Sequence, residues 1–120
     1  MEFRVVYYED EHGHRPVEQF IRDLKRRNTD LHGLVIRGLE RLRDSRNHGE
    51  PMTKPVRDGL FELRIGHKDA ARILWFFAVG PKIVLVHGFV KKTDRIPEAH
   101  LRVALSRRDE YLARSRRLGR

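Results

Sequence analysis

The apolar residues of this chain are concentrated in one stretch, residues 60–93, with the sequence LFELRIGHKDAARILWFFAVGPKIVLVHGFVKKT. Two turn-forming segments, GHKDA and the Gly80-Pro81 dipeptide, divide this stretch into three short runs rich in Ile, Leu, Phe and Val. Short runs of this composition between turn residues are typical of β-strands. We therefore predict a three-stranded antiparallel meander formed by residues 60–65, 71–79 and 83–89.

Alternation along the strands assigns side chains to the two faces of the predicted sheet, because successive residues of a strand point in opposite directions. We take Gly80 and Pro81 as a two-residue loop and pair Ile65 with Ala71. One face is then wholly apolar and is the predicted core face. It carries Phe61, Leu63, Ile65, Ile73, Trp75, Phe77, Val79, Val84, Val86 and Val90.

The opposite face of the predicted meander mixes apolar, acidic and basic side chains. It carries Glu62, Arg64, Arg72, Leu74, Phe76, Leu85, His87, Phe89 and Lys91. In this register Arg64 lies directly across from Arg72, and Arg72 lies across from Phe89. Like charges directly opposite one another destabilise a sheet. The pattern therefore indicates that this face binds an anion, and phosphate is the anion we expect.

The segments on either side of the meander predict one more strand and three helices. Residues 3–8 are β-branched and aromatic, as in a strand. Apolar residues repeat at helical spacing after Pro16 and again after the candidate N-cap Asn28, which predicts a helical hairpin over residues 16–48. Residues 50–59 contain two prolines and predict an irregular lead-in to the meander. Pro97 fits the first turn of a C-terminal helix.

These segments together predict a single α+β domain. It comprises a strand and loop over residues 1–15, the helical hairpin over 16–48, the meander over 54–93 and the C-terminal helix over 97–116. One face of that last helix carries Leu101, Ala104, Leu105, Tyr111 and Leu112.

The composition of the 120-residue chain narrows the function classes. Lys and Arg number 26 against 17 Asp and Glu, so the formal net charge is +9, which is typical of nucleic-acid-binding domains but also of proteins that bind acidic partners. The chain has no Cys, and its His residues show no metal-ligand spacing such as HExxH. We therefore expect neither a metal nor another cofactor.

The hydropathy of the chain predicts where it works. No segment approaches the roughly 20 apolar residues of a membrane helix. The N-terminal sequence MEFRVVYYEDEHGH lacks the basic and then apolar layout of a signal peptide. We expect a cytoplasmic protein that does not bind membranes.

The motifs ELRI, ARILWFF and VLVHGFVKKT, followed by a helix that opens with PEAH, resemble the RelE/ParE superfamily of type II toxins, and more closely its phage-derived, HigB-like branch. The resemblance covers nearly the whole chain. It implies a RelE-like fold, in which an antiparallel sheet of about four strands carries an N-terminal helical hairpin on one face and is followed by a C-terminal helix. It also implies a ribosome-dependent mRNA endonuclease that inhibits translation. The implied partners are the ribosome, mRNA and a cognate antitoxin, often a small helix-turn-helix protein.

The resemblance and the sheet pattern together give a candidate site. Metal-free RNA cleavage needs a base for the 2′-hydroxyl proton, cations for the phosphate and an acid for the leaving oxygen. The candidate catalytic residues are Arg64, Arg72, His87 and Lys91. The candidate RNA-binding residues are Lys54, Arg57, Phe89, Lys92, Arg107 and Arg108. RelE-type enzymes also use a C-terminal tyrosine, but Tyr111 is spaced like a core residue, so the identity of the acid and base stays open.

Each candidate also has a purely structural explanation. Arg64 could pair with Glu62 or Asp69, His87 and Phe89 could be packing residues, and the arginines of the last helix could form a solvated face. Two other functions also remain open. One is a ParE-like protein that inhibits DNA gyrase by binding, and the other is a catalytically inactive nucleic-acid-binding relative. The cationic cluster favours the nuclease over the gyrase inhibitor, because a pure protein binder does not need such a cluster.

Overall fold

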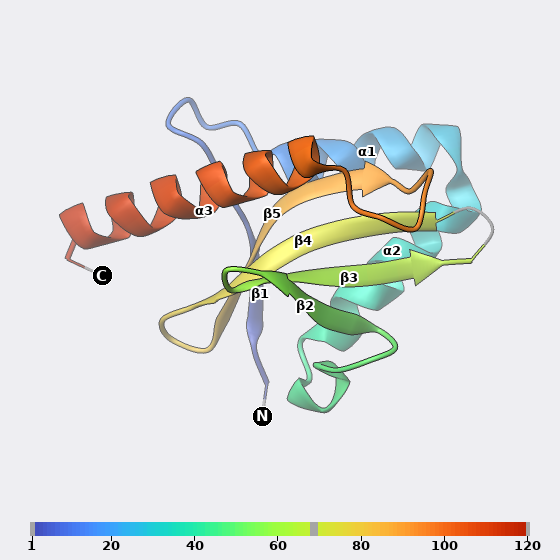
Figure 1. Cartoon of the computed structure of the whole chain (residues 1–120), viewed down its shortest axis with the longest axis horizontal. Helices are drawn as coiled ribbons and strands as arrows, with labels where there is room; N and C mark the ends of the chain where they lie inside the picture. The colour runs from blue at the N-terminus through green and yellow to red at the C-terminus, as the bar shows by residue number, and fades with distance from the viewer. Residues whose placement is uncertain (1, 68–69, 120) are drawn as a thin grey trace.

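A mixed sheet lies between two helical layers in the computed structural model, which describes residues 2–67 and 70–119 (Figure 1). Within these residues the sheet has five strands in the order β1-β5-β4-β3-β2. β1 pairs in parallel with β5, and all other pairs are antiparallel. The strands are β1 (Arg4–Tyr7), β2 (Thr53–Arg57), β3 (Leu60–Gly66), β4 (Ala70–Ala78) and β5 (Lys82–Val90).

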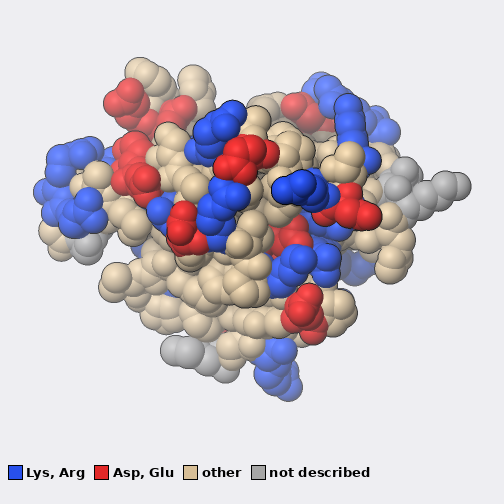
Figure 2. Space-filling model, viewed as in Figure 1, with Lys and Arg blue, Asp and Glu red and all other residues tan. Residues whose placement is uncertain are grey.

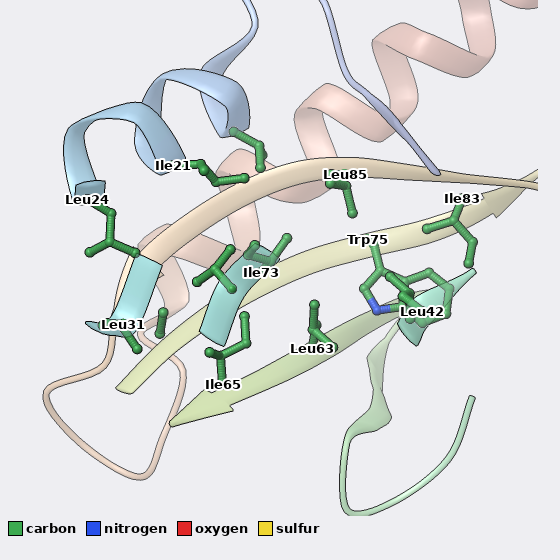
Figure 3. Close-up of a cluster of buried hydrophobic side chains, with 13 residues drawn as sticks. Ile21, Leu24, Leu31, Leu42, Leu63, Ile65, Ile73, Trp75, Ile83 and Leu85 are labelled. Carbon is green, nitrogen blue, oxygen red and sulfur yellow. The ribbon is translucent and has the colours of Figure 1, made fainter. Parts of the chain in front are cut away.

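One face of the sheet is covered by the helical hairpin that the sequence predicts, formed by α1 (Pro16–Arg27) and α2 (Thr29–Leu42). The side chain of Asn28 accepts a hydrogen bond from the backbone N–H of Leu31, so it caps α2 as expected. Figure 3 shows the apolar side chains packed between this hairpin and the sheet. They include Ile21, Leu24, Leu31, Leu42, Leu63, Ile65, Ile73, Trp75, Ile83 and Leu85. A short 3₁₀ helix, η1 (Ser45–Asn47), follows α2.

The other face of the sheet is covered by the C-terminal helix, α3 (Glu98–Arg117). Leu101 and Ala104 are buried in a second apolar cluster on this face, and Leu105, Tyr111 and Leu112 pack against it. These five residues are the apolar face predicted for this helix. Among the described residues, no helix has the length and hydropathy that a membrane span requires.

The sheet differs from the predicted one in two respects. Residues 50–59 were predicted to be irregular, but they contain β2, which pairs with β3 and has a bulge between Pro55 and Arg57. Proline is tolerated in β2 because this strand lies at the edge of the sheet. The N-terminal strand joins in parallel at the opposite edge, so the sheet is mixed and has one strand more than expected.

The predicted register is correct at one end of the meander and wrong at the other. Arg64 pairs with Arg72, and Arg72 pairs with Phe89, as predicted. The loop after β4 has three residues, 79–81, because Ala78 pairs with Lys82. A bulge after Leu74 then returns the pairing to the predicted register.

The residues between this loop and the bulge therefore change faces, since a slip of one residue inverts every side chain. Val84 and Val86 lie with Leu74 and Phe76 on the α3 side, and not on the predicted core face. Leu85 and Ile83 take the places beside Trp75. Phe77, Val79 and Val90 are also predicted core residues but are exposed. Phe77 is the second-last residue of β4, Val79 lies in the loop after it, and Val90 is the last residue of β5.

Candidate functional site

An open pocket of about 570 Å³ lies where the loop after η1 approaches β3 and β4, and we call it the basic pocket. Its lining comes from α2, from η1, from the loop between η1 and β2, from β3 and the residue after it, from β4, and from the residue after β5. The lining residues are Arg41, Arg46, Asn47, Gly49, Glu50, Pro51, Met52, Arg64, Gly66, His67, Arg72 and Lys91. Figure 2 shows Lys and Arg side chains, with some Asp and Glu among them, over the face that Figure 1 presents. The sequence predicts three of these residues, Arg64, Arg72 and Lys91, as catalytic.

Glu62 forms the centre of a charge cluster beside the basic pocket, and only 3% of its surface is exposed. Its Oε1 lies 3.2 Å from Arg64 Nε and 3.8 Å from Lys54 Nζ, and its Oε2 lies 3.6 Å from Arg72 Nε. The ion pair of Arg64 with Glu62 that the sequence left open is therefore present. The alternative partner, Asp69, lies outside the described residues.

Arg72 is the more deeply placed of the two arginines, with 8% of its surface exposed. Its Nη1 donates a hydrogen bond to the carbonyl of Ala71 at 2.9 Å. Burial lowers the pKa of Arg72, the charge of Glu62 raises it and that of Arg64 lowers it. Arginine nevertheless stays charged at physiological pH. Arg72 therefore gives the pocket a permanent positive charge on a buried side chain.

Lys91 reaches the basic pocket from the end of β5. Its backbone N–H donates to the carbonyl of Ala70, and its Nζ lies 3.1 Å from Asp94 Oδ1. Asp94 is fully exposed, and an exposed ion pair of this kind contributes little free energy. Lys91 can therefore exchange this partner for a phosphate at small cost.

His87 lies outside the lining of the basic pocket, beneath α3. Its Nδ1 is 3.2 Å from Arg107 Nη1, and its Nε2 is 2.7 Å from His100 Nδ1. A guanidinium can only donate, so His87 Nδ1 accepts, and its Nε2–H donates to His100. Burial, together with the charges of Arg107 and His100, lowers the pKa of His87 to about 4. The ring is therefore neutral at pH 7, with both nitrogens engaged.

Phe89 and Tyr111 are aromatic residues for which the sequence allows either a packing role or a functional one. Phe89 is 8% exposed, and its ring stacks on His100 with centroids 4.0 Å apart. One face of Phe89 is therefore covered. Tyr111 packs edge-on against Phe76 and accepts a hydrogen bond from Lys82 Nζ. Tyr111 is not among the residues that line the basic pocket.

The remaining RNA-binding candidates are not among the residues that line the basic pocket. Arg57 pairs with Glu98 at the start of α3, and Arg108 donates to the carbonyl of Asp58. Lys92 is exposed. Arg107 donates to the carbonyl of Val86, and burial lowers the pKa of Arg107. The structure brings together Arg64, Arg72 and Lys91, with Lys54 on the far side of Glu62, and places the other candidates elsewhere.

Sequence reasoning missed nine of the twelve residues that line the basic pocket. Arg41 lies in the last turn of α2, and Arg46 and Asn47 lie in η1. They approach β3 only because β2 folds back along it. His67 follows β3 in a segment that the sequence identifies only as a turn. A cluster of basic and turn residues between α2 and the meander was the available signal. Within the described residues, no three His, Asp or Glu side chains are grouped so that they could hold a metal ion.

A comparison with protein families gives one match that spans the site. The model of the family described as Phage derived protein Gp49-like (DUF891) matches residues 19–109. The matched segment runs from α1 into α3 and includes Glu62 and the whole lining of the basic pocket. A search of curated proteins found no match.

Proposed function

Because the chain belongs to the Phage derived protein Gp49-like family, a RelE/HigB-like toxin family, we propose that it is the toxin of a type II toxin–antitoxin system and that it cleaves mRNA on the ribosome. The observation that supports this proposal most is the basic pocket. The pocket is lined by several arginines and a lysine, so its charge suits a nucleic-acid phosphate, as the family relationship leads us to expect. The assignment to the HigB-like branch is part of the same proposal.

The cations of the basic pocket would bind the phosphate at which the RNA is cut. Guanidinium groups bind phosphate oxygens in a bidentate way, and Arg64 and Arg72 stand side by side on neighbouring strands. Lys91 adds a third cation from β5. Fixed cations of this kind stabilise the charge that develops on the phosphorane, so their main role would be in the transition state.

The reaction we propose is transfer of the phosphate to the neighbouring 2′-hydroxyl. The 2′-oxygen attacks phosphorus and loses its proton to a base, and the bond from phosphorus to the 5′-oxygen breaks. An acid protonates the leaving 5′-oxygen, which leaves a 2′,3′-cyclic phosphate and a 5′-hydroxyl. His67 lines the basic pocket and is exposed, so we propose it for one of the two proton transfers.

His87 stays a predicted catalytic residue, but its place in the fold makes it the weaker choice. Its two ring nitrogens contact His100 and Arg107 of α3, and the residue is only half-buried. A direct role for His87 would require its ring to release one of these two contacts. Substitution of each histidine in turn distinguishes the two assignments.

A cognate antitoxin is the partner we propose for the resting state. Family membership suggests such a partner, and the net charge of +9 favours an acidic segment that covers the basic pocket. The antitoxin we expect is a small helix-turn-helix protein encoded beside this chain.

Expression in growing bacteria with pulse labelling tests the proposed function. If the chain cleaves mRNA on the ribosome, growth stops and incorporation of labelled methionine falls before incorporation of labelled thymidine. Arg64→Ala should relieve the arrest at equal expression, whereas Arg26→Ala should not. Arg26 is a matched control because its side chain is 78% exposed and pairs with Asp23, one turn away on α1. Loss of DNA supercoiling before any effect on translation would instead support a gyrase inhibitor.

A further inference from the structure

Glu62 is the only Asp or Glu that is buried among residues 2–67 and 70–119. A buried carboxylate is costly unless cations and hydrogen bonds compensate for lost hydration. The cations are present on three sides. Lys54 lies directly opposite on β2, Arg64 lies two residues along β3, and Arg72 lies diagonally across on β4. Glu62 therefore lies within ion-pair distance of all three cationic side chains.

The two oxygens of Glu62 face different arginines. Oε1 lies 3.2 Å from the Nε of Arg64, and Oε2 lies 3.6 Å from the Nε of Arg72. The Nε atom of each guanidinium therefore lies near the carboxylate as one half of an ion pair. Neither contact is a hydrogen bond, because Arg64 Nε is buried without a hydrogen-bond partner in the described part of the chain and the Arg72 distance is too long. A guanidinium has five N–H donors, so the Nη groups of both arginines still have donors for a phosphate.

Glu62 also offsets the repulsion within the arginine pair. Arg64 and Arg72 are directly opposite in the sheet, where like charges destabilise each other. With Lys54 the cluster around Glu62 has three cations and one buried carboxylate, which leaves an excess of two positive charges. A second carboxylate, that of Glu50, lies 3.8 Å from Arg64 Nη1 on a side chain that is 68% exposed. The excess around Glu62 matches the two negative charges of a phosphorane, whereas a cluster without Glu62 would repel itself when no RNA is bound.

We propose that Glu62 is a positioning residue, which holds Arg64 and Arg72 by their Nε sides so that both present their remaining N–H groups to one phosphate. This proposal rests on the proposed nuclease function for its effect on rate. The effect it predicts for loss of Glu62 is opposite to the effect expected if Glu62 acted only through its charge. Removal of a negative charge should strengthen RNA binding, whereas loss of positioning should slow the chemical step.

The first test is the rate of cleavage by Glu62→Gln, which keeps the shape of the side chain and removes its charge. We expect kcat on ribosome-bound mRNA to fall 10- to 100-fold, with KM unchanged or lower. Glu62→Asp withdraws the carboxylate by one methylene group and should give an intermediate kcat. The control is Glu40→Gln, which causes the same change in charge at a side chain that is 71% exposed and paired with Arg43. Folded Glu62 variants with kcat within twofold of the parent would overturn the proposal.

The second test needs no enzymatic activity, so it separates failure of the positioning role from failure of the nuclease function. The Nε–Hε signals of Arg64 and Arg72 are recorded by ¹⁵N NMR, with and without inorganic phosphate. In the parent both signals should be protected from exchange with water and should shift as phosphate is added. In Glu62→Gln, or in Glu62→Asp if the first variant does not fold, they should broaden while core methyl signals stay in place. Equal protection in parent and variant would refute positioning, whereas a parent with protected arginines and no RNA cleavage would refute the nuclease function alone.

Discussion

Arg64 on β3 lies directly opposite Arg72 on β4, and the Nε atoms of both face the buried carboxylate of Glu62. The sequence predicts this arginine pair from strand alternation and from the pairing of Ile65 with Ala71. The structure adds Glu62 as the group that makes the pair tolerable. The two arginines also line the basic pocket together with Lys91. This arrangement is the basis of the functional predictions below.

Arg64→Ala should lower the rate of RNA cleavage by about one to two orders of magnitude, because loss of a charge-assisted contact to phosphate costs about 1.5–3 kcal/mol. The fold should persist, since the Arg64 side chain is 36% exposed. The measurement is the single-turnover rate on ribosome-bound message, beside a circular dichroism spectrum. A variant with the parent rate would remove Arg64 from the phosphate site, and Arg26→Ala serves as the control.

Thr53→Val should destabilise the fold by about 1–3 kcal/mol, because two buried groups lose their partner. The Thr53 hydroxyl donates to the carbonyl of Glu62 at 2.6 Å and accepts from Trp75 Nε1 at 3.2 Å. The free energy of unfolding in urea can be followed by the fluorescence of Trp75, the only tryptophan of the chain. Thr29→Val removes an exposed hydroxyl and should change stability by less than about 0.5 kcal/mol. Equal effects of the two substitutions would contradict this account of Thr53.

Alanine should have opposite effects at two glycines. A Cβ added to Gly88 would lie 2.6 Å from Cδ2 of Phe20, so Gly88→Ala should force α1 away from β5 at a cost of about 1–3 kcal/mol. A Cβ added to Gly33 in α2 would meet no atom within 4 Å, so Gly33→Ala should stabilise the helix by about 0.5–1 kcal/mol. Thermal unfolding of both variants checks the two signs. A stabilising Gly88→Ala would show that Phe20 does not pack as described.

The stability of the fold should depend on pH through His87. The pKa of His87 is lowered from its ordinary value of 6.5 to about 4 by burial and by the charges of Arg107 and His100. The unfolded chain therefore binds more protons between pH 4 and 6.5, so the free energy of unfolding falls as pH falls through this window. With partial solvent screening the effect is on the order of 2 kcal/mol.

His87→Gln isolates this contribution, because the carboxylates titrate equally in parent and variant. Urea unfolding at pH 4.5 and pH 7.5 gives the loss of stability for each protein. The loss should be smaller in His87→Gln. Equal losses would mean that the ring of His87 is not held neutral by the fold.

The secondary structure could be predicted from the sequence wherever local signals are strong. Pro16, Asn28 and the apolar spacing that follows each of them define the helical hairpin, and the stretch over residues 60–93 gives the meander. The strand at residues 53–57 was missed because Pro55 and the flanking turn residues resemble a loop. Such a strand forms only when β3 offers a partner. The parallel pairing of β1 with β5 is likewise a long-range contact that no local pattern contains.

The candidate site was predictable only in part, for the same physical reason. Alternation places Arg64 and Arg72 correctly because the pairing of β3 with β4 has no bulge. The pair of Arg72 with Phe89 is also correct, because it lies beyond the bulge between β4 and β5, where the register returns to the simple one. The same alternation places His87 on the correct face but cannot show that α3 covers it. The charge cluster around Glu62 depends on the pairing of three strands, β2, β3 and β4. The rest of the pocket depends on the loop before β2, which only the tertiary fold brings close to β3. The catalytic and RNA-binding roles of all these residues stay predictions.

Primer extension on a translated message tests the central claim most directly. The purified chain is added to a reconstituted translation system, and the message is compared with the same message without ribosomes and with the Arg64→Ala variant. We predict ribosome-dependent breaks that end in a 2′,3′-cyclic phosphate, and fewer breaks with the variant. A message that stays intact on translating ribosomes, with supercoiling by gyrase inhibited in a parallel assay, would contradict the proposed nuclease function and support a ParE-like inhibitor.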